Sequence, residues 1–224
     1  RRDLTINAMA IKQVPLEEAL GPVDQAEGLW QRYVIDPFNG QDDLKNHVLR
    51  HVSDEGFVED PLRVLRLARF CAKFPTFTVA DETMKLCKKM VADGMLNHLT
   101  AERVGNETIK ALSERRPVRY FIFLQAVGAL KTLMPEIHNL VGVPAGSFTH
   151  HPEGDTFTHT MLVMDQATVH MNWNTEAARS TEDKEFSAMM HWCSLVHDLG
   201  KGTTPKEILP KHHGHEERGV PLVE

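Results

Sequence analysis

The 224-residue sequence contains few cysteines and no long apolar run. Its three cysteines, Cys71, Cys87 and Cys193, are scattered, and they form neither a disulfide framework nor a zinc-binding spacing. No apolar stretch approaches the roughly 20 residues that a membrane-spanning helix needs, and the first residues lack the pattern of a secretory leader. From these absences we expect neither a disulfide framework nor a membrane span in this sequence, and a reducing cytoplasm as the default location.

The sequence also lacks the excess of positive charge that is typical of nucleic-acid-binding proteins. It has 25 lysines and arginines against 31 aspartates and glutamates, which gives a net charge of -6. Binding of a polyanion would therefore depend on local clusters of charge. One cluster extends from Arg63 to Lys73, and a second contains Arg115, Arg116 and Arg119. The second is equally well explained by helix capping and solubility.

The most informative segment is EDPLRVLRLARF, residues 59–70. Its proline suits the first turn of a helix, where a missing N–H costs nothing, so we expect Asp60 near the N-cap. Arg63, Arg66 and Arg69 follow at three-residue intervals and form a cationic ridge on one face. The apolar residues between them predict a helix that is anchored in a core while the ridge stays free.

A ridge of arginines suits a polyanionic ligand such as a triphosphate, because guanidinium groups match phosphate oxygens. Asp60 beside Arg63 also suits the edge of a base, since the carboxylate accepts hydrogen bonds and the guanidinium donates them. The spacing alone is equally compatible with a solvated helix face that is held by weak surface ion pairs. The flanking sequence has to decide between these interpretations.

Two further motifs precede this helix. The chain begins with RRDLTINAMA, residues 1–10, a basic pair that leads into an apolar, partly alternating run. We expect a short buried strand in TINAMAIK, residues 5–12. Residues 35–44, IDPFNGQDDL, combine Asp-Pro and Asn-Gly turn dipeptides with an acidic pair.

Taken together, RRDLTINAMA, DPFNGQDDL and EDPLRVLRLARF resemble the consecutive motifs of the class II tRNA nucleotidyltransferases, which comprise CCA-adding enzymes and bacterial poly(A) polymerases. The resemblance implies that Arg2 contacts the nucleotide phosphates. It also implies that Asp60 and Arg63 read the base of incoming CTP or ATP, and that Arg66 and Arg69 hold the nucleotide.

The C-terminal part contains a second group of residues with metal-binding chemistry. His197 and Asp198 stand in HDLGK, and His159 lies on an apolar run 38 residues earlier. Imidazole suits zinc, nickel, iron or cobalt, whereas carboxylate also suits manganese and magnesium, so the pair does not name the metal. We expect residues 188–196 to form a buried helix that ends at His197, and Lys201 to meet a phosphate as a catalytic residue.

HDLGK with an upstream histidine resembles the HD phosphohydrolase motif. The neighbouring segments 149–160 and 210–216 resemble the HD domain fused to CCA-adding enzymes of gamma-proteobacterial type. The resemblance implies that His159, His197 and Asp198 bind a divalent transition metal, with Ni²⁺ as one candidate. It also implies phosphatase and 2′,3′-cyclic phosphodiesterase activity, in which metal-activated water attacks phosphorus.

Other histidines are less informative, because most of the 13 are equally explained as surface or hydrogen-bonded core residues. The superfamily usually has a further, distant aspartate ligand, and no aspartate follows Asp198 in this sequence. For His212, His213 and His215 three roles stay open: a substrate contact, an outer ligand, or exposure to solvent.

The sequence predicts a mainly α protein: the end of a mixed α/β nucleotidyltransferase head, a helical neck and body, and an all-α HD domain. We expect the head over 1–52, the neck with its nucleotide-selecting helices over 53–114, body and linker helices over 115–147, and the N-terminal part of the HD domain over 148–224. Helices are expected at about 61–74, 80–93, 100–113, 117–128 and 157–171. The segment from Thr100 to Leu112 resembles a family element that braces the neck, and we expect ion pairs from it.

The resemblance implies tRNA 3′-end CCA addition and repair with CTP and ATP. Nucleotidyl transfer needs carboxylates that hold two Mg²⁺ ions. The family's Gly-rich turn and its aspartate pair are not in this sequence, and Asp42 and Asp43 lack the strand context to replace them. We therefore expect these ligands upstream of Arg1 in a longer chain, and no nucleotide addition by the 224 residues alone. The expected partners are tRNA, CTP and ATP, with a homodimer left open.

Two other functions are compatible with the same motifs. One is a metal-dependent HD phosphohydrolase whose N-terminal region is not catalytic and only binds RNA. The other is a tRNA-binding scaffold with a degenerate HD site. Intact metal-binding aspartates upstream of this sequence would favour the transferase.

Overall fold

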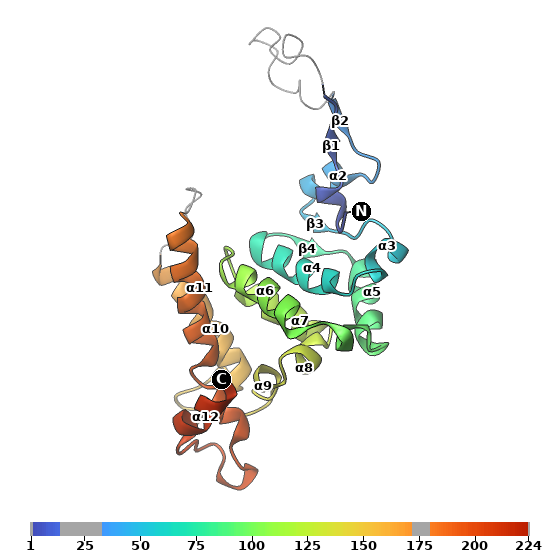
Figure 1. The fold of residues 1–224 in the computed structure, drawn as a ribbon. Coiled ribbons are helices and arrows are strands. Elements are labelled where there is room, and N and C mark those ends of the chain that lie inside the picture. Colours follow the sequence, from blue (N-terminus) through green and yellow to red (C-terminus); the bar gives the residue numbers. More distant parts are fainter. Residues whose placement is uncertain (1, 14–32, 172–179, 224) are drawn as a thin grey trace.

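The computed structural model describes residues 2–13, 33–171 and 180–223, which are mostly helical, as the sequence predicts. Strands β1 and β2 lie near one end of the molecule, β3 and β4 lie beside α4, and the helices that follow extend to the other end (Figure 1). None of the described helices is long and apolar enough to cross a membrane.

The N-terminal part is built from short elements, and the strand predicted for residues 5–12 is found only at its end. Strand β1 pairs antiparallel with β2, while Thr5 begins a 3-10 turn instead of a strand. The Thr5 hydroxyl donates to Asp43 Oδ2 at 2.7 Å, and the Leu4 N–H donates to Asn7 Oδ1 at 3.2 Å. The local Leu4–Asn7 bond competes with a strand ladder, and the Thr5–Asp43 bond ties the turn to a distant segment. The elements are η1 (Thr5–Asn7), β1 (Ala10–Ile11), β2 (Val34–Ile35) and α2 (Gly40–Lys45).

The middle of the chain forms a helical unit on a second small sheet, in which β3 pairs parallel with β4. Thr100 caps α6 by accepting the Arg103 N–H at 3.4 Å, as its place in the sequence predicts. Helix α7 ends before Gly128, whose φ of 82° suits a residue without Cβ. The elements are β3 (Val48–Leu49), α3 (Asp54–Val58), α4 (Leu62–Lys73), β4 (Thr78–Val79), α5 (Asp81–Ala92), η4 (Met95–His98), α6 (Ala101–Leu112), α7 (Val118–Ala126), α8 (Ala129–Leu133) and α9 (Pro135–His138).

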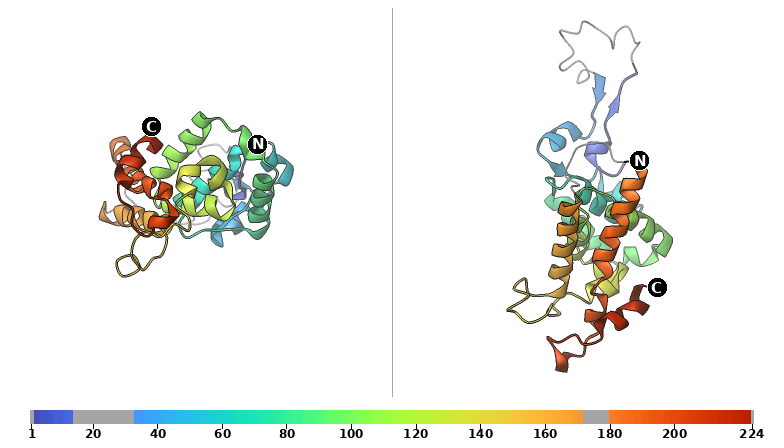
Figure 2. Two further views of the ribbon diagram at one scale, coloured as in Figure 1. Left: turned by 90° about the horizontal axis from the view of Figure 1, so that it is seen from below. Right: turned by 90° about the vertical axis from the view of Figure 1, so that its left-hand side faces the viewer.

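Two long helices, α10 and α11, run side by side along one flank of the molecule (Figure 2). Helix α10 is capped by Asp155, which accepts the Thr158 N–H at 2.8 Å, and α11 ends at Val196, immediately before His197. The C-terminal helix α12 packs against the 3-10 turn that follows α11. The elements are α10 (Thr156–His170), α11 (Thr181–Val196), η5 (Leu199–Thr203), η6 (Lys206–Ile208) and α12 (His215–Val223).

One continuous apolar core runs through these parts, from Leu4 near the N-terminus to Leu199 after α11. At its centre, α4 packs against α6 and α7, and it buries its apolar face completely at Val64 and Leu65. Burial of this face contributes the main favourable term in folding. The position of α4 in the core fixes the arginines that it carries.

A buried histidine joins the two long helices to the middle unit. The His191 side chain, on α11, is fully buried. Its Nδ1 lies 2.8 Å from the backbone oxygen of Leu112 at the end of α6, and its Nε2 lies 2.9 Å from the hydroxyl of Thr168 on α10. Because buried polar groups are costly without partners, these contacts fix how α10 and α11 dock on the core.

Candidate functional site

The arginine ridge of α4 does not stay free, and this part of the prediction was wrong. The carboxylate of Asp3 lies over the ridge. Its Oδ1 is 3.3 Å from Arg63 Nε and its Oδ2 is 2.5 Å from Arg66 Nε. Arg63 is only 9% exposed and also donates through Nη1 to the backbone oxygen of Gly56. One carboxylate between two arginines offsets one of their two charges and so weakens the field that the spacing alone suggests.

The remaining charges of the ridge pair with α6 and the turn after it. Arg69 Nε is 2.9 Å from Glu107 Oε2, and its Nη1 is 3.2 Å from Glu114 Oε1. Asp60 accepts from Arg103 Nη2 at 2.9 Å. Lys110 completes the network with a contact of 3.1 Å to Glu107. The ion pairs predicted for residues 100–112 are therefore confirmed, while their role as a brace stays a prediction.

Glu107 is the central acid of this network, and its replacement gives a test of the brace. The side chain is buried, and burial raises its pKa, but hydrogen bonds from Arg69 and Lys110 lower the pKa more, so the net shift is downward. We expect Glu107→Gln to lower the free energy of unfolding by about 3 kcal/mol at pH 7, because Arg69 loses its buried partner.

The pH dependence of this loss follows from the sign of the shift. A carboxyl with a lowered pKa contributes its stabilisation in full above its ordinary pKa, and loses it as the pH falls through the folded value. The difference between the wild type and Glu107→Gln should therefore begin to shrink near the ordinary pKa of about 4.3 and vanish only below the lowered pKa of the folded state. Urea unfolding across this range measures the difference, with Glu185→Gln, an exposed site on α11, as the control. Equal stabilities at pH 7 would contradict a bracing role.

In the cluster of Arg115, Arg116 and Arg119, one arginine pairs with an acid and a second binds a backbone oxygen. Arg116 makes two contacts of 2.7 Å with Asp165 on α10, and Arg119 donates to the backbone oxygen of Phe77 at 3.1 Å. Arg115 is exposed. These arginines join α7 to its neighbours, which agrees with the structural interpretation of the cluster.

A cavity of about 520 Å³ lies at one end of the ridge. Arg2 lines it, as does Gly56, whose backbone oxygen binds Arg63. The exposed ring of Phe38 and the Glu55 carboxylate add an aromatic face and an acceptor. Of the predicted nucleotide-binding residues, Arg2 alone lines this cavity. Arg63 is linked to it through the Gly56 backbone oxygen, and Asp60, Arg66 and Arg69 are not among the lining residues either. A larger cavity of about 710 Å³, between α6 and α11, is mainly apolar and is lined by none of the predicted site residues.

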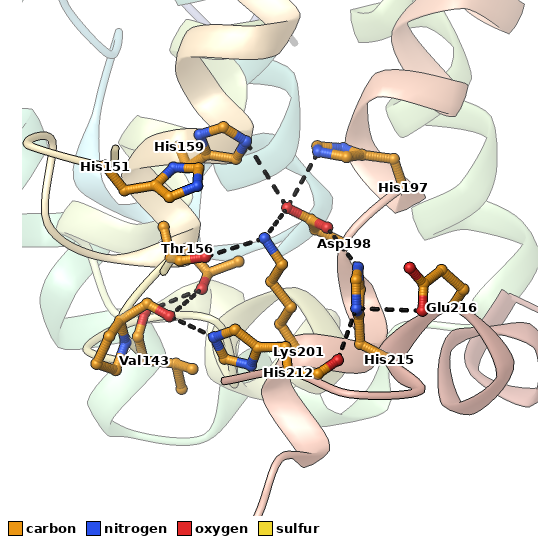
Figure 3. Close-up of polar contacts among 12 residues, drawn as sticks. Val143, His151, Thr156, His159, His197, Asp198, Lys201, His212, His215 and Glu216 are labelled. Atoms are coloured by element: carbon orange, nitrogen blue, oxygen red, sulfur yellow. Dashed lines mark hydrogen bonds and ion pairs between the residues drawn. The ribbon is translucent and has the colours of Figure 1, made fainter. Parts of the chain in front are cut away.

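The second group of predicted residues converges closely (Figure 3). His159 extends from α10, and His197 and Asp198 follow the end of α11. Asp198 Oδ2 lies 3.2 Å from His197 Nε2 and 3.7 Å from His159 Nε2. The possible ligand atoms of the three residues all lie within 4.8 Å of one another. The three residues predicted as metal ligands are therefore close enough to share one ion.

Lys201 is buried beside this group. Its Nζ donates to Asp198 Oδ2 at 2.8 Å and to the backbone oxygen of Ala145 at 3.0 Å. An ammonium group has three donors, so these contacts leave at most one for a phosphate. The predicted catalytic role of Lys201 stays a prediction, and its observed contacts tie Asp198 to the loop before α10.

The charge at the centre of the group is negative. Burial raises the pKa of Asp198, but the hydrogen bonds from His197 and Lys201 lower it by a larger amount. The net pKa is well below its ordinary value. The hydrogen bond to Asp198 in turn raises the pKa of His197 against the opposing effect of burial. The carboxylate is therefore ionised at neutral pH, and several cationic or polar groups are directed toward it.

Three histidines around Asp198 share one hydrogen-bonding pattern. In each, Nδ1 faces an oxygen that can only accept, so Nδ1 carries a proton, and Nε2 is the nitrogen that would offer its electron pair to a metal after losing its own proton. In each, Nε2 is turned toward Asp198. This is the arrangement of metal-ligating histidines, whose other ring nitrogen donates to an acceptor. The Nδ1 contacts are His159 to Glu153 Oε1 at 2.6 Å, His197 to the Ser194 backbone oxygen at 2.8 Å and His215 to the His212 backbone oxygen at 2.8 Å.

The three C-terminal histidines prove to have different environments. His215 joins the site, with Nε2 3.2 Å from Asp198 Oδ1. His212 is buried and bonds to the backbone oxygen of Pro144 at 2.7 Å and to the Thr204 hydroxyl at 2.8 Å, so both its nitrogens are engaged. His213 is exposed.

The sequence did not predict that Glu153 and His151 lie at the metal site, or that Asp3 lies over the ridge. Glu153 bonds to both His159 and His151, and these three side chains also lie close enough to share an ion. The sequence contained a hint, since Glu153 stands in the segment 149–160 that resembles an HD domain. Asp3 follows the arginine pair of the first motif, but its partners lie about sixty residues away, and spacing could not reveal them.

Comparisons with known proteins agree with the motifs. The family described as "Probable RNA and SrmB- binding site of polymerase A" matches residues 76–141. The multifunctional CCA protein of Paraburkholderia phytofirmans is 46% identical over 223 residues, which cover 100% of this chain and 48% of that protein.

Two solved structures have a fold similar to that of this chain. The apo form of a tRNA-processing enzyme has a TM-score of 0.59 at 23% identity, over 99% of this chain and 54% of that one. A tRNA nucleotidyltransferase complexed with a primer tRNA and an incoming ATP analog has a TM-score of 0.50 at 25% identity. The match covers 99% of this chain and 67% of that one. The chain spans about half the length of the curated relatives it matches. From end to end it is thus similar to a segment that makes up about half of the multifunctional CCA proteins, as its motifs predict.

Proposed function

We propose that this chain is part of a CCA-adding tRNA nucleotidyltransferase, which adds and repairs the 3′ end of tRNA with CTP and ATP. The observation that carries the proposal is the similarity of the whole chain to a multifunctional CCA protein, at 46% identity over 223 residues. The likeness to a tRNA nucleotidyltransferase in complex with tRNA and an ATP analog supports the same partners.

In this proposal the cavity beside α4 receives the nucleotide. Arg2 contacts the phosphates, while Asp60 and Arg63 read the base from a helix that the core holds rigid. Arg66 and Arg69 hold the nucleotide by exchanging a carboxylate partner for phosphate oxygens, which a guanidinium binds in the same geometry. Rigid placement matters because selection between two bases depends on fixed donors and acceptors.

The Mg²⁺ ions of nucleotidyl transfer do not fit the acidic pair on α2. Asp43 is buried, and its carboxylate already accepts from Thr5 and from Arg50 Nε. Two-metal sites need carboxylates that are free to face the phosphates. We therefore propose that residues outside this chain supply the Mg²⁺ ligands.

Nucleotide binding tests the first part of the proposal. We expect CTP and ATP to bind the chain, and Arg2→Ala to weaken both by about 10 to 100-fold, the equivalent of one charge-assisted hydrogen bond. Isothermal titration calorimetry measures the affinities. Arg115→Ala, which removes an exposed arginine outside the cavity lining, is the matched control. Unchanged affinity in Arg2→Ala would remove Arg2 from the site.

For the C-terminal part we infer a metal-dependent phosphohydrolase of the HD type. The specific observation in its favour is the convergence of three Nε2 atoms on one buried, ionised carboxylate. His159, His197 and Asp198 would hold a divalent transition metal, with Ni²⁺ as one candidate, since imidazole and carboxylate together suit such ions. The metal, when bound, supplies an activated water for attack on phosphorus.

The substrates proposed for this site are phosphomonoesters and 2′,3′-cyclic phosphates, which a repair enzyme would meet at RNA ends. Lys201 fixes Asp198, and one remaining N–H of its ammonium group is available to a phosphate oxygen. A hydrolase whose N-terminal region only binds RNA is the disfavoured alternative, because the relatives that match the whole chain are named as CCA proteins.

A further inference from the structure

We propose that Glu153 is a positioning residue, which sets the tautomer and the orientation of His159 for metal binding. The proposal rests on the metal site proposed above, and it concerns a residue outside the predicted ligand set. Glu153 lies in the turn before α10, and His159 lies one turn inside that helix.

The contact between the two side chains is short and shielded. Glu153 Oε1 lies 2.6 Å from His159 Nδ1, and the carboxylate is only 15% exposed. A carboxylate accepts and does not donate, so the bond holds the proton of the neutral imidazole on Nδ1. The electron pair is then on Nε2, the nitrogen that faces Asp198 at 3.7 Å. Carboxylate partners of this kind fix the ring and raise the basicity of a ligating histidine.

Glu153 is itself held in place by its neighbours. His151 Nδ1 lies 3.0 Å from the same Oε1, and its ring packs edge-on against His159. The His151 ring also lies against Gly146, where an added Cβ would come within 2.4 Å of its Cδ2. A carboxylate that is fixed by two rings can orient one of them, whereas a mobile one cannot.

The loop that carries Glu153 is tied back to the metal site. The Ala145 N–H donates to the Gly154 backbone oxygen at 3.1 Å, and the Ala145 backbone oxygen accepts from Lys201, which also contacts Asp198. A closed ring of contacts therefore joins the Asp198 side of the site to the Glu153 side. Through this ring, both partners of His159 keep a constant separation.

A competing interpretation is that His151, Glu153 and His159 hold a second ion of their own. In that case His159 would have to offer Nδ1 to this ion while Nε2 serves the first. A neutral imidazole has only one ring nitrogen without a proton, so it cannot do both. The geometry therefore favours one ion with Glu153 beside it, and the stoichiometry of binding separates the two interpretations.

The test is a titration with Co²⁺, whose visible absorption reports its ligand geometry. The wild type should bind one ion. Glu153→Ala should bind about 10 to 100-fold more weakly, the usual effect of losing an outer partner of a ligand. Glu153→Gln should lose less of its affinity for Co²⁺, because its amide oxygen still accepts a hydrogen bond from His159 Nδ1. Glu207→Ala, at an exposed glutamate, should match the wild type.

A second measurement separates positioning from a general loss of structure. Nitrogen NMR of the metal-free protein should show His159 as the Nδ1-protonated tautomer in the wild type and in Glu153→Gln, and as a mixture in Glu153→Ala. An affinity unchanged in Glu153→Ala, or two ions in the wild type with one lost in that variant, would overturn the positioning role. If the wild type binds no Co²⁺, the proposed metal site fails instead, and the tautomer measurement still decides the role of Glu153.

Discussion

Replacement of His197 by alanine is expected to lower the affinity for Co²⁺ or Ni²⁺ by more than about 100-fold, because losing a direct ligand exceeds the 10 to 100-fold cost of losing an outer partner. Hydrolysis of a 2′,3′-cyclic nucleotide should lose its metal stimulation in the same variant. His197 is the best ligand to remove, since its side chain is 35% exposed and its loss leaves a small hole at the surface.

The other ligands are poorer choices for this test. Removing the Asp198 carboxylate would leave the buried ammonium of Lys201 without its charged partner, and breaking such a pair typically costs about 3 to 5 kcal/mol of stability. Loss of metal binding in that variant could then reflect unfolding.

The matched control is His213→Ala, because His213 belongs to the same histidine-rich stretch but is exposed. Metal affinity is measured by calorimetry, and hydrolysis is measured with and without added metal. We expect the control to behave as the wild type in both assays. Metal binding retained in His197→Ala would show that the three converging side chains are not the ligands.

Much of the helical structure could be predicted because its signals are local. The helices expected at 61–74, 80–93, 100–113 and 157–171 are found with ends within one residue of prediction, and the helix expected at 117–128 is two residues shorter at its end. Proline at a first turn, a threonine cap and apolar residues every three to four positions act within one element. Such signals do not depend on the rest of the fold.

The predictions that failed depend on distant partners. The ridge was expected to stay free because the helix pattern places its arginines away from the core, whereas Asp3, about sixty residues earlier, reaches Arg63 and Arg66 through the tertiary fold. The strand expected at residues 5–12 was replaced in part by a turn, because the hydroxyl of Thr5 bonds to Asp43. In both cases, contacts between separate segments override the local pattern.

At the candidate metal site, too, the residues with local sequence signals could be predicted and those defined by distant contacts could not. His197 and Asp198 are adjacent and could be recognised by motif, and His159 could be recognised by its place on an apolar run. Glu153 was not predicted and the role of His215 stayed open among three, because a sequence does not show that Glu153 faces His159 Nδ1 or that His215 Nε2 faces Asp198. The hydrogen bond that Nδ1 of each histidine makes can be identified only in the three-dimensional structure.

The last prediction concerns Gly200, two residues after Asp198. A Cβ at this position would come within 1.8 Å of the His215 backbone oxygen and 2.7 Å of the Gly219 nitrogen. Both are backbone atoms of α12, so no side-chain rotation can relieve the clash. We expect Gly200→Ala to lower the free energy of unfolding by about 3 kcal/mol, the upper part of the usual range for overpacking.

The same substitution should also weaken metal binding. To make room, α12 must move away from the turn that begins at Leu199, and this turn follows Asp198 directly. His215 would then lose its contact with Asp198, and the carboxylate would shift relative to His159 and His197. Denaturant unfolding and Co²⁺ titration of the same samples measure both effects.

Gly105→Ala provides the opposite control. Gly105 lies inside α6, and a Cβ there would meet no atom within 4 Å. Alanine favours a helix over glycine by up to about 1 kcal/mol, so this variant should be slightly more stable than the wild type and should bind Co²⁺ equally well. If Gly200→Ala behaved like Gly105→Ala, the close packing of α12 on the turn after Asp198 could not be what holds His215 at the site.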